Sequence, residues 1–168
     1  FLLTAAASFA QPPHDSHAMP PLARELVERP LPLRTGIGTA HDAVSTTSSQ
    51  AQAFYDQGLA YLHSYVWIEA ARSFHQALRL DTTLAMANVG LSYAYVELRA
   101  PAEARAALDR ARTVAAIATE HDRRHIDVRA AQMAAEDAPA DAVKLGAYRK
   151  AVDEALATFP SDEELVLQ

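Results

Sequence analysis

Two consecutive stretches of the chain decide the fold: AQAFYDQGLAYLHSYVWIEAARSFHQALRLDTT at residues 51–83 and AMANVGLSYAYVELRAPAEARAALDRARTVAA at residues 85–116. Within both stretches, apolar residues recur every three or four positions, which predicts amphipathic helices. The run Leu80-Asp81-Thr82-Thr83 interrupts this pattern. It separates a first pair of helices from a second pair, which we expect at about 84–98 and 102–115.

Residues that lie 34 positions apart in these stretches have matching sizes. Small residues fall on small ones and bulky residues on bulky ones at five places: Gly58 and Ser92, Tyr61 and Tyr95, Ala70 and Ala104, Phe74 and Leu108, and Ala77 and Ala111. Two helices that cross closely need a small residue where their backbones meet and a bulky one beside it. The offset therefore predicts stacked copies of one helix pair, with alanines at the crossing points.

A third and altered unit follows at about residues 119–160. Its second helix has the expected spacing in Tyr148, Val152, Ala155 and Pro160. Tyr148 stands where the other units have a small residue, so this pair is expected to cross at a wider or rotated angle. Its first helix is expected to begin near Glu120 and to end before Pro139.

This layout resembles that of tetratricopeptide repeat (TPR) proteins. The first unit matches the TPR pattern through Phe54, Gly58, Tyr61, Ala70, Phe74 and Ala77, and the second through Leu91, Ser92, Tyr95, Ala104, Leu108 and Ala111. Residues 36–59 are also similar to the opening of large exported bacterial TPR proteins, whose function is mostly unassigned. The resemblance implies an all-α, right-handed solenoid of TPR-type helical hairpins at 48–160, after an extended Pro-rich leader at 11–47.

The two ends of the sequence have patterns of their own, a signal-peptide pattern at the N-terminal end and a helix start at the C-terminal end. Residues 1–10, FLLTAAASFA, resemble the end of a secretory signal peptide, because an apolar run closes with small residues before a polar, proline-rich stretch. We therefore expect export from a bacterial cell, to the periplasm or, as the alternative, to the extracellular space. Ten apolar residues cannot span a bilayer, which takes about 20, so no transmembrane segment is expected in the mature chain. Residues 161–168 have the pattern of a helix start capped by Ser161 or Asp162, and we expect the natural chain to continue beyond them.

Composition excludes several classes of function. Of the 168 residues, 37 are alanine and 5 are glycine, a balance that favours helix over β-structure. The absence of cysteine excludes disulfides, cysteine-ligated metal sites and a thiol nucleophile. A net charge of −6 disfavours binding to nucleic acid. The serines at 45–49 have the context of a helix cap, provided by Ser48 or Ser49, and not that of a catalytic nucleophile. We therefore expect a protein that is not an enzyme and has no cofactor.

The TPR resemblance also implies a binding surface, since the first helix of each pair lines the concave side of such a stack. The corresponding residues are Tyr55, Leu59, Leu62, His63, Met86, Val89, Tyr93 and Val96. An apolar groove on a surface indicates something that covers it. We expect the groove to bind a protein or peptide partner through an apolar peptide segment or a helix. The expected role is that of a scaffold or assembly subunit, which can associate peripherally with a membrane complex. The alternative is that the leader or further repeats fill the groove.

The leader suggests a second hypothesis, which concerns copper. His14, His17 and Met19 lie within one hexapeptide, and imidazole with thioether donors suits copper. Copper handling by the leader, with the repeats as a platform, therefore stays open as an alternative. The sequence favours the simpler interpretation that these residues are solvated and that the chain has no metal site.

Two further groups of residues have a structural and a functional interpretation. His121 and His125 are four residues apart on an expected helix, which is a ligand spacing, but their neighbours are charged. We interpret this face as solvated, with pairs such as Arg123 with Asp127. Tyr65 and Trp67 lie between the helices of the first unit, where packing between helices is favoured over an exposed aromatic contact.

Overall fold

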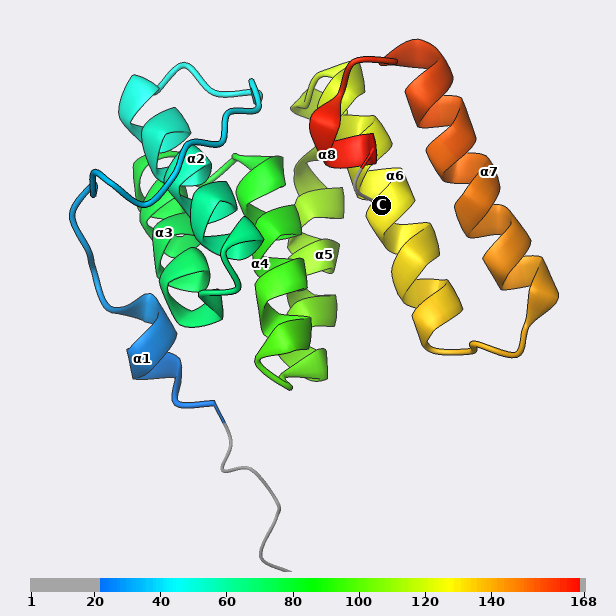
Figure 1. The fold of residues 1–168 in the computed structure, drawn as a ribbon, viewed down its shortest axis with the longest axis horizontal. Helices are drawn as coiled ribbons and strands as arrows, with labels where there is room; N and C mark the ends of the chain where they lie inside the picture. Colours follow the sequence, from blue (N-terminus) through cyan, green and yellow to red (C-terminus); the bar gives the residue numbers. More distant parts are fainter. Residues whose placement is uncertain (1–21, 167–168) are drawn as a thin grey trace, which may run out of the picture.

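The computed structural model describes residues 22–166, and these form helices and loops without any strand. Three helical hairpins stand side by side in this part of the chain (Figure 1). In chain order the helices are α1 (Arg24–Glu28), α2 (Ser49–His63), α3 (Trp67–Leu80), α4 (Ala85–Glu97), α5 (Pro101–Val114), the short 3-10 helix Ala115–Ile117, α6 (Glu120–Glu136), α7 (Ala142–Thr158) and α8 (Glu163–Val166). The prediction of an all-α fold is confirmed, and α4 and α5 lie within one residue of the bounds expected from the sequence.

Helices α2 and α4 end in the same way, 34 residues apart. Tyr65 and Arg99, which follow the two C-caps, have left-handed backbone with φ of 62° and 58°. The next amide, of Val66 or Ala100, donates to the carbonyl five residues earlier at 2.9 Å in both cases. This is the Schellman arrangement, which satisfies terminal carbonyl groups and turns the chain sharply. The recurrence found in the sequence is therefore present in the backbone as well.

Phe74 of α3 is fully buried where the first two hairpins meet. Its ring lies so close to Gly58 of α2 and Gly90 of α4 that a Cβ atom on either glycine would come within 2.4 Å of it. The close approach of three helices therefore depends on two residues that have no side chain. Burial is confirmed for the alanines predicted at helix crossings, which are 0% exposed: Ala70, Ala77, Ala104 and Ala111.

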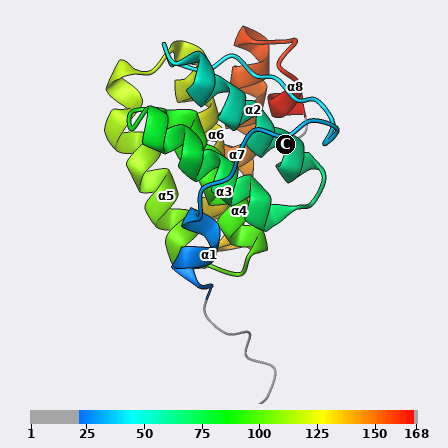
Figure 2. The same cartoon turned by 90° about the vertical axis from the view of Figure 1, so that its left-hand side faces the viewer.

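The leader packs against the first hairpin from residue 22 onward. Residues 24–28 of the leader form the single helical turn α1, which lies against α3. Gln57 of α2 then holds the backbone of residues 32 and 34 with hydrogen bonds of 3.3 and 2.6 Å. Gln52, one turn earlier, holds residues 42 and 44 with bonds of 2.7 and 3.1 Å. The leader thus runs along α3 and α2 and crosses the start of α2 (Figure 2).

The last hairpin, α6 and α7, has a small core of its own. Val128, Ala155 and Leu165 are buried in it, and Tyr148 packs against them. Leu165 belongs to α8, and its amide donates to Asp162 Oδ1 at 3.1 Å. Asp162 therefore caps the helix start predicted at Ser161 or Asp162. Ser48 likewise caps α2, where its hydroxyl accepts from the Ala51 amide at 3.1 Å.

Several predictions concern residues outside the described range of 22–166. These are the signal-peptide segment at 1–10 and the copper candidates His14, His17 and Met19. Within the described range, every helix is too short or too polar to cross a bilayer.

Candidate functional site

The eight residues predicted to line a groove lie together on α2 and α4. They border two adjoining cavities, a larger one of about 370 Å³ and a smaller one of about 220 Å³. Four of them are buried, at 4% exposure or less: Tyr55, Leu59, Met86 and Val89. Leu62, Tyr93 and Val96 are half-buried, and His63 is exposed.

The second wall of both cavities comes from the C-terminal part of the chain. Gln132 of α6 lines both, and Glu164 of α8 lines the smaller cavity, where its carboxylate lies 3.1 Å from His63 Nε2. No residue of the described leader, 22–47, lines either cavity. The apolar face is therefore less open than the groove expected from the sequence, because α6 and α8 cover part of it.

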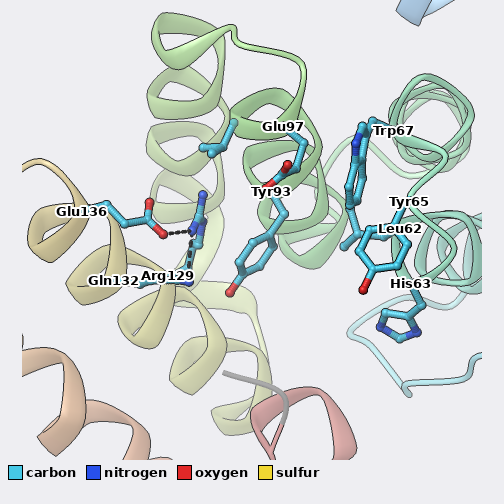
Figure 3. Close-up of a pocket in the computed structure, with 10 residues that line it drawn as sticks. Leu62, His63, Tyr65, Trp67, Tyr93, Glu97, Arg129, Gln132 and Glu136 are labelled. Atoms are coloured by element: carbon cyan, nitrogen blue, oxygen red, sulfur yellow. Dashed lines mark hydrogen bonds and ion pairs between the residues drawn. The ribbon is translucent and has the colours of Figure 1, made fainter.

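The wall of the larger cavity is aromatic on one side and polar on the other (Figure 3). Tyr65 and Trp67 meet edge to face, with ring centroids 5.4 Å apart. Tyr65 is 78% exposed, so the interpretation that it packs between helices was wrong. The left-handed backbone at the end of α2 turns this side chain outward, where it forms a rim of the cavity beside half-buried Trp67.

Arg129 of α6 forms the polar side of the larger cavity and is only 1% exposed. Its guanidinium lies over the ring of Tyr93, 4.0 Å from the centroid. Nε and Nη2 donate to the hydroxyl and carbonyl oxygens of Ser92 at 2.9 and 3.2 Å, and Nη1 donates to Gln132 at 2.7 Å. Glu136 lies 3.5 Å away. The buried cation is thus fully engaged, and it fixes the orientation of Tyr93.

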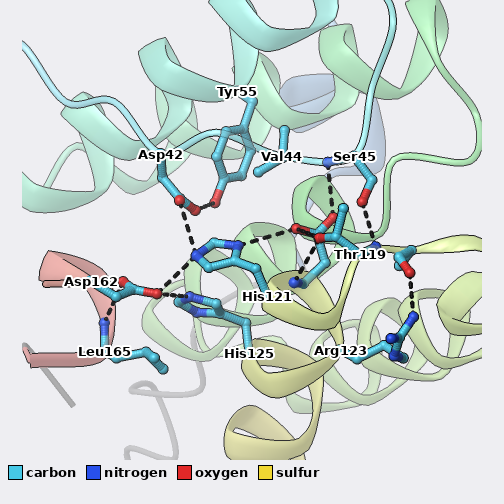
Figure 4. Close-up of polar contacts among 12 residues, drawn as sticks. Asp42, Val44, Ser45, Tyr55, Thr119, His121, Arg123, His125, Asp162 and Leu165 are labelled. Atoms are coloured by element: carbon cyan, nitrogen blue, oxygen red, sulfur yellow. Dashed lines mark hydrogen bonds and ion pairs between the residues drawn. The ribbon is translucent and has the colours of Figure 1, made fainter. Parts of the chain in front are cut away.

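A second group of side chains lies where the leader, α6 and the turn before α8 meet (Figure 4). We call Asp42, His121, His125 and Asp162 the Asp–His cluster. One carboxylate oxygen of Asp162 lies 2.8 Å from His121 Nε2 and 2.7 Å from His125 Nε2. Asp42 Oδ1 lies 3.4 Å from His121 Nε2. Atoms of Asp42, His121 and His125 lie within 4.8 Å of one another, close enough to ligate one metal ion.

The interpretation of this face of α6 as solvated was wrong. His125 is 5% exposed, and Asp122 beside it is completely buried. The guanidinium of Arg123 donates to the Ala118 carbonyl, and the exposed pair on this helix is Arg124 with Glu120 at 3.3 Å.

Each member of the cluster except His125 is oriented by a further hydrogen bond. His121 Nδ1 lies 3.3 Å from Asp122, and that carboxylate in turn accepts from the Ser45 amide at 3.0 Å. The hydroxyl of Tyr55 donates to Asp42 at 3.1 Å. The Leu165 amide orients Asp162, as described above. Tyr55, predicted to contact a partner, therefore holds the leader in place.

Charge and burial shift the pKa values of the cluster. Hydrogen bonds to Asp122 and to Asp162 raise the pKa of His121 to about 10, against the effect of burial. Burial raises the pKa of Asp42 to about 6 despite the nearby imidazoles. Burial would also raise the pKa of Asp162, but hydrogen bonds from His121 and His125 outweigh it and hold that pKa far below its usual range. At neutral pH, a protonated His121 therefore lies beside an ionised Asp162.

No family model, curated protein or solved structure matches this chain. What the chain can do chemically follows from the two features described above. The larger cavity can take an apolar or aromatic side chain. The Asp–His cluster presents nitrogen and oxygen atoms that can share protons or a cation.

Some of these residues had no signal in the sequence. The four-residue spacing of His121 and His125 is visible in the sequence, but Asp42 and Asp162 come from segments that only the fold brings beside them. Arg129 continues the same spacing by one more turn of helix. This spacing places the three side chains along one side of the helix, but a polar stripe gives no indication that the side is buried.

Proposed function

We propose that this chain is a non-enzymatic protein-interaction module of the TPR type, in which a partner peptide or helix occupies the larger cavity. The assignment to TPR, and with it a right-handed solenoid, is supported by recurrence at 34 residues in two independent features. These are the residue sizes at the helix crossings and the Schellman turns at Tyr65 and Arg99. The concave side of such a stack is an extended surface that can bind a partner.

The observation that carries this proposal is the open, aromatic-rimmed cavity itself. Leu62, Tyr93, Val96 and Trp67 leave part of their apolar surface exposed there, and Tyr65 is 78% exposed. Exposed aromatic side chains beside a pocket of about 370 Å³ are typical of a site that anchors one large side chain of a partner.

The charges around the larger cavity indicate what flanks that anchor. Glu97 and Glu136 are both exposed on its wall. The buried Arg129 lies 3.5 Å from Glu136 but donates its hydrogen bonds to Ser92 and Gln132. A partner with a Lys or Arg beside its apolar anchor would therefore gain opposite charge at the edge of the contact. The proposed ligand is a segment that combines an aromatic or large aliphatic residue with a basic neighbour.

The proposed setting is the bacterial periplasm, in a scaffold or assembly subunit that associates peripherally with a membrane complex. Support comes from the apolar segment at 1–10, with Ser8 and Ala10 at the positions that a signal peptidase requires.

Selection from a displayed library of random peptides would test the binding proposal. The full chain should select peptides with an apolar or aromatic residue beside Lys or Arg, and their binding should change the fluorescence of Trp67, the single tryptophan. The double variant Tyr65→Ala/Trp67→Ala should bind the selected peptides at least about tenfold more weakly, because truncated aromatic anchors dominate binding energy.

The matched control removes exposed apolar side chains that do not line the cavity. Ile117 and Val143 are 70% and 81% exposed, and Ile117→Ala/Val143→Ala should bind the selected peptides as the wild type does. Equal binding by both double variants would show that the larger cavity is not the binding site.

A further inference from the structure

Four side chains from three separate segments converge near the start of α6 (Figure 4). Two imidazole Nε2 atoms face one oxygen of Asp162 at 2.7 and 2.8 Å, and one of them faces Asp42 at 3.4 Å. We propose that Asp42, His121, His125 and Asp162 bind a divalent transition-metal ion, for which Zn²⁺ is the best chemical match.

The donor set suits zinc in type and number. Two imidazole nitrogens and two carboxylate oxygens are ligands that Zn²⁺ accepts in tetrahedral geometry, and without a thiolate the site does not favour softer ions. For metal–ligand distances of about 2.0–2.1 Å, tetrahedral ligand atoms lie about 3.3 Å apart. The pair formed by Asp42 and His121 is at 3.4 Å. The two contacts of Asp162 need to open by about half an ångström to admit the ion.

The groups behind the ligands are arranged as in zinc sites. A ligating histidine usually directs its second ring nitrogen to a carboxylate or carbonyl, which fixes the ring and strengthens the ligand. His121 Nδ1 does this toward Asp122, which is itself fixed by the Ser45 amide. Tyr55 and the Leu165 amide occupy the remaining oxygens of Asp42 and Asp162. These bonds leave Nε2 of His121, Oδ1 of Asp42 and Oδ2 of Asp162 available to the ion.

Burial and charge also favour a cation. The side chains of Asp42, Asp162 and His125 are 10%, 5% and 6% exposed, so the site excludes most solvent. Three carboxylates, counting Asp122, meet two imidazoles there. A cavity of about 460 Å³ reaches Asp42, His121 and Asp162 from the surface. Acidic residues 163 and 164 line it as well, which attracts cations toward the cluster.

The first experiment is a titration of the full chain, after removal of metals with a chelator, by Zn²⁺ in a calorimeter. One saturable event at one ion per chain is expected. X-ray absorption at the zinc edge should then show two imidazole ligands with oxygen in the remaining positions. This measurement on the wild type does not depend on whether any variant folds.

Variants assign the ion to the cluster. His125→Gln and Asp162→Asn should each weaken Zn²⁺ binding by more than about 100-fold. That is the largest loss of affinity expected when a residue behind a ligand is changed. Asp122→Asn, which alters only the group behind His121, should weaken binding by about 10- to 100-fold. Circular dichroism spectra equal to that of the wild type are required of each variant that is compared.

The matched control is the triple leader variant His14→Ala/His17→Ala/Met19→Leu, which should bind Zn²⁺ with unchanged affinity and stoichiometry. Loss of binding in this control would assign the ion to the leader and overturn the proposal. The absence of a saturable event in the wild type would also overturn it and leave the cluster as a hydrogen-bonded contact only. Binding that survives in folded His125→Gln or Asp162→Asn would have the same meaning.

Discussion

The ring of Phe74 occupies the place where a side chain on Gly58 would have to stand. An ideal Cβ atom at Gly58 would lie 2.4 Å from the ring, and the ring itself is fully buried. The contact joins the two helices of the first hairpin. It explains why the sequence has a glycine at this crossing position and a phenylalanine sixteen residues later.

Gly58→Ala should therefore destabilise the protein, although alanine is the better helix former. The gain in helix propensity is about 1 kcal/mol, whereas forcing an extra carbon into a packed core costs about 1–3 kcal/mol, and 2.4 Å is far inside van der Waals contact. We expect a net loss of up to about 2 kcal/mol in the free energy of unfolding, measured by urea denaturation.

Gly146→Ala is the matched control for this experiment. Gly146 lies within α7, and nothing comes within 4 Å of a Cβ atom built on it. The same substitution should here stabilise the protein by about 0.5–1 kcal/mol. Changes of the same sign at both positions would contradict the account of the Phe74 contact.

Arg99→Gly should stabilise the turn after α4. Arg99 has a φ of 58°, a conformation that costs a residue with a Cβ atom about 1 kcal/mol and costs glycine nothing. We expect an increase of about 0.5–1 kcal/mol in the free energy of unfolding. Arg99→Ala, which removes the same side chain but keeps the Cβ atom, should give no such gain. If both variants have the same stability, the backbone conformation is not the cause.

Arg129→Ala should be severely destabilising. The guanidinium is buried, donates twice to Ser92 and covers the ring of Tyr93, so its removal leaves polar atoms without partners and a cavity beside them. A loss of about 2–4 kcal/mol is expected in chemical denaturation. Arg105→Ala is the control, because Arg105 forms an exposed ion pair with Asp137 at 2.6 Å, and its removal should cost less than about 0.5 kcal/mol. Comparable losses in the two variants would contradict the special role of Arg129.

His75 should make the protein sensitive to acid. Its Nε2 lies 2.8 Å from the Tyr95 hydroxyl, and burial lowers its pKa to about 4, with Arg79 and Arg110 opposing Glu28 nearby. The unfolded chain therefore takes up this proton more readily than the folded one does. The contribution of neutral His75 is fully present above pH 6.5 and is lost as the pH falls from 6.5 toward 4, by no more than about 3 kcal/mol.

Urea denaturation of the wild type and of His75→Gln between pH 4 and 8 would measure this contribution. Glutamine can bond to Tyr95 but does not titrate, so the difference in stability between the two proteins should be constant above pH 7. It should shift in favour of the variant below pH 6. Parallel curves over the whole range would exclude His75 as the source of the acid sensitivity.

The hairpins could be predicted from the sequence because their determinants are local. A crossing alanine such as Ala70 and a bulky partner such as Phe74 lie a few residues apart, and caps such as Ser48 act within one helical turn. Recurrence of these patterns after 34 residues then fixed the pairing of the helices without any knowledge of distant contacts.

The buried side of α6 could not be predicted in the same way. Asp122, His125 and Arg129 form a polar stripe, and hydrophobic patterning assigns such a stripe to solvent. Their burial is tolerated because Ser45, Asp162 and Ser92 satisfy them, and these partners lie 77, 37 and 37 residues away in the sequence. The Asp–His cluster and the polar wall of the larger cavity are consequences of this pairing, so neither was visible from the chain alone.

The bond between the Ser45 amide and Asp122 also constrains the order of folding. Hairpins of neighbouring helices close short loops and can form as the chain emerges from the ribosome. Residues 42–45 can bond to Gln52 and Tyr55 of the first hairpin early, but their contacts with α6 have to wait for residues made some 77 positions later. The docking of this segment is therefore completed late, although the segment is synthesised before the first hairpin. Folding therefore begins with contacts between neighbouring helices and is completed by a contact between segments that are far apart in the sequence.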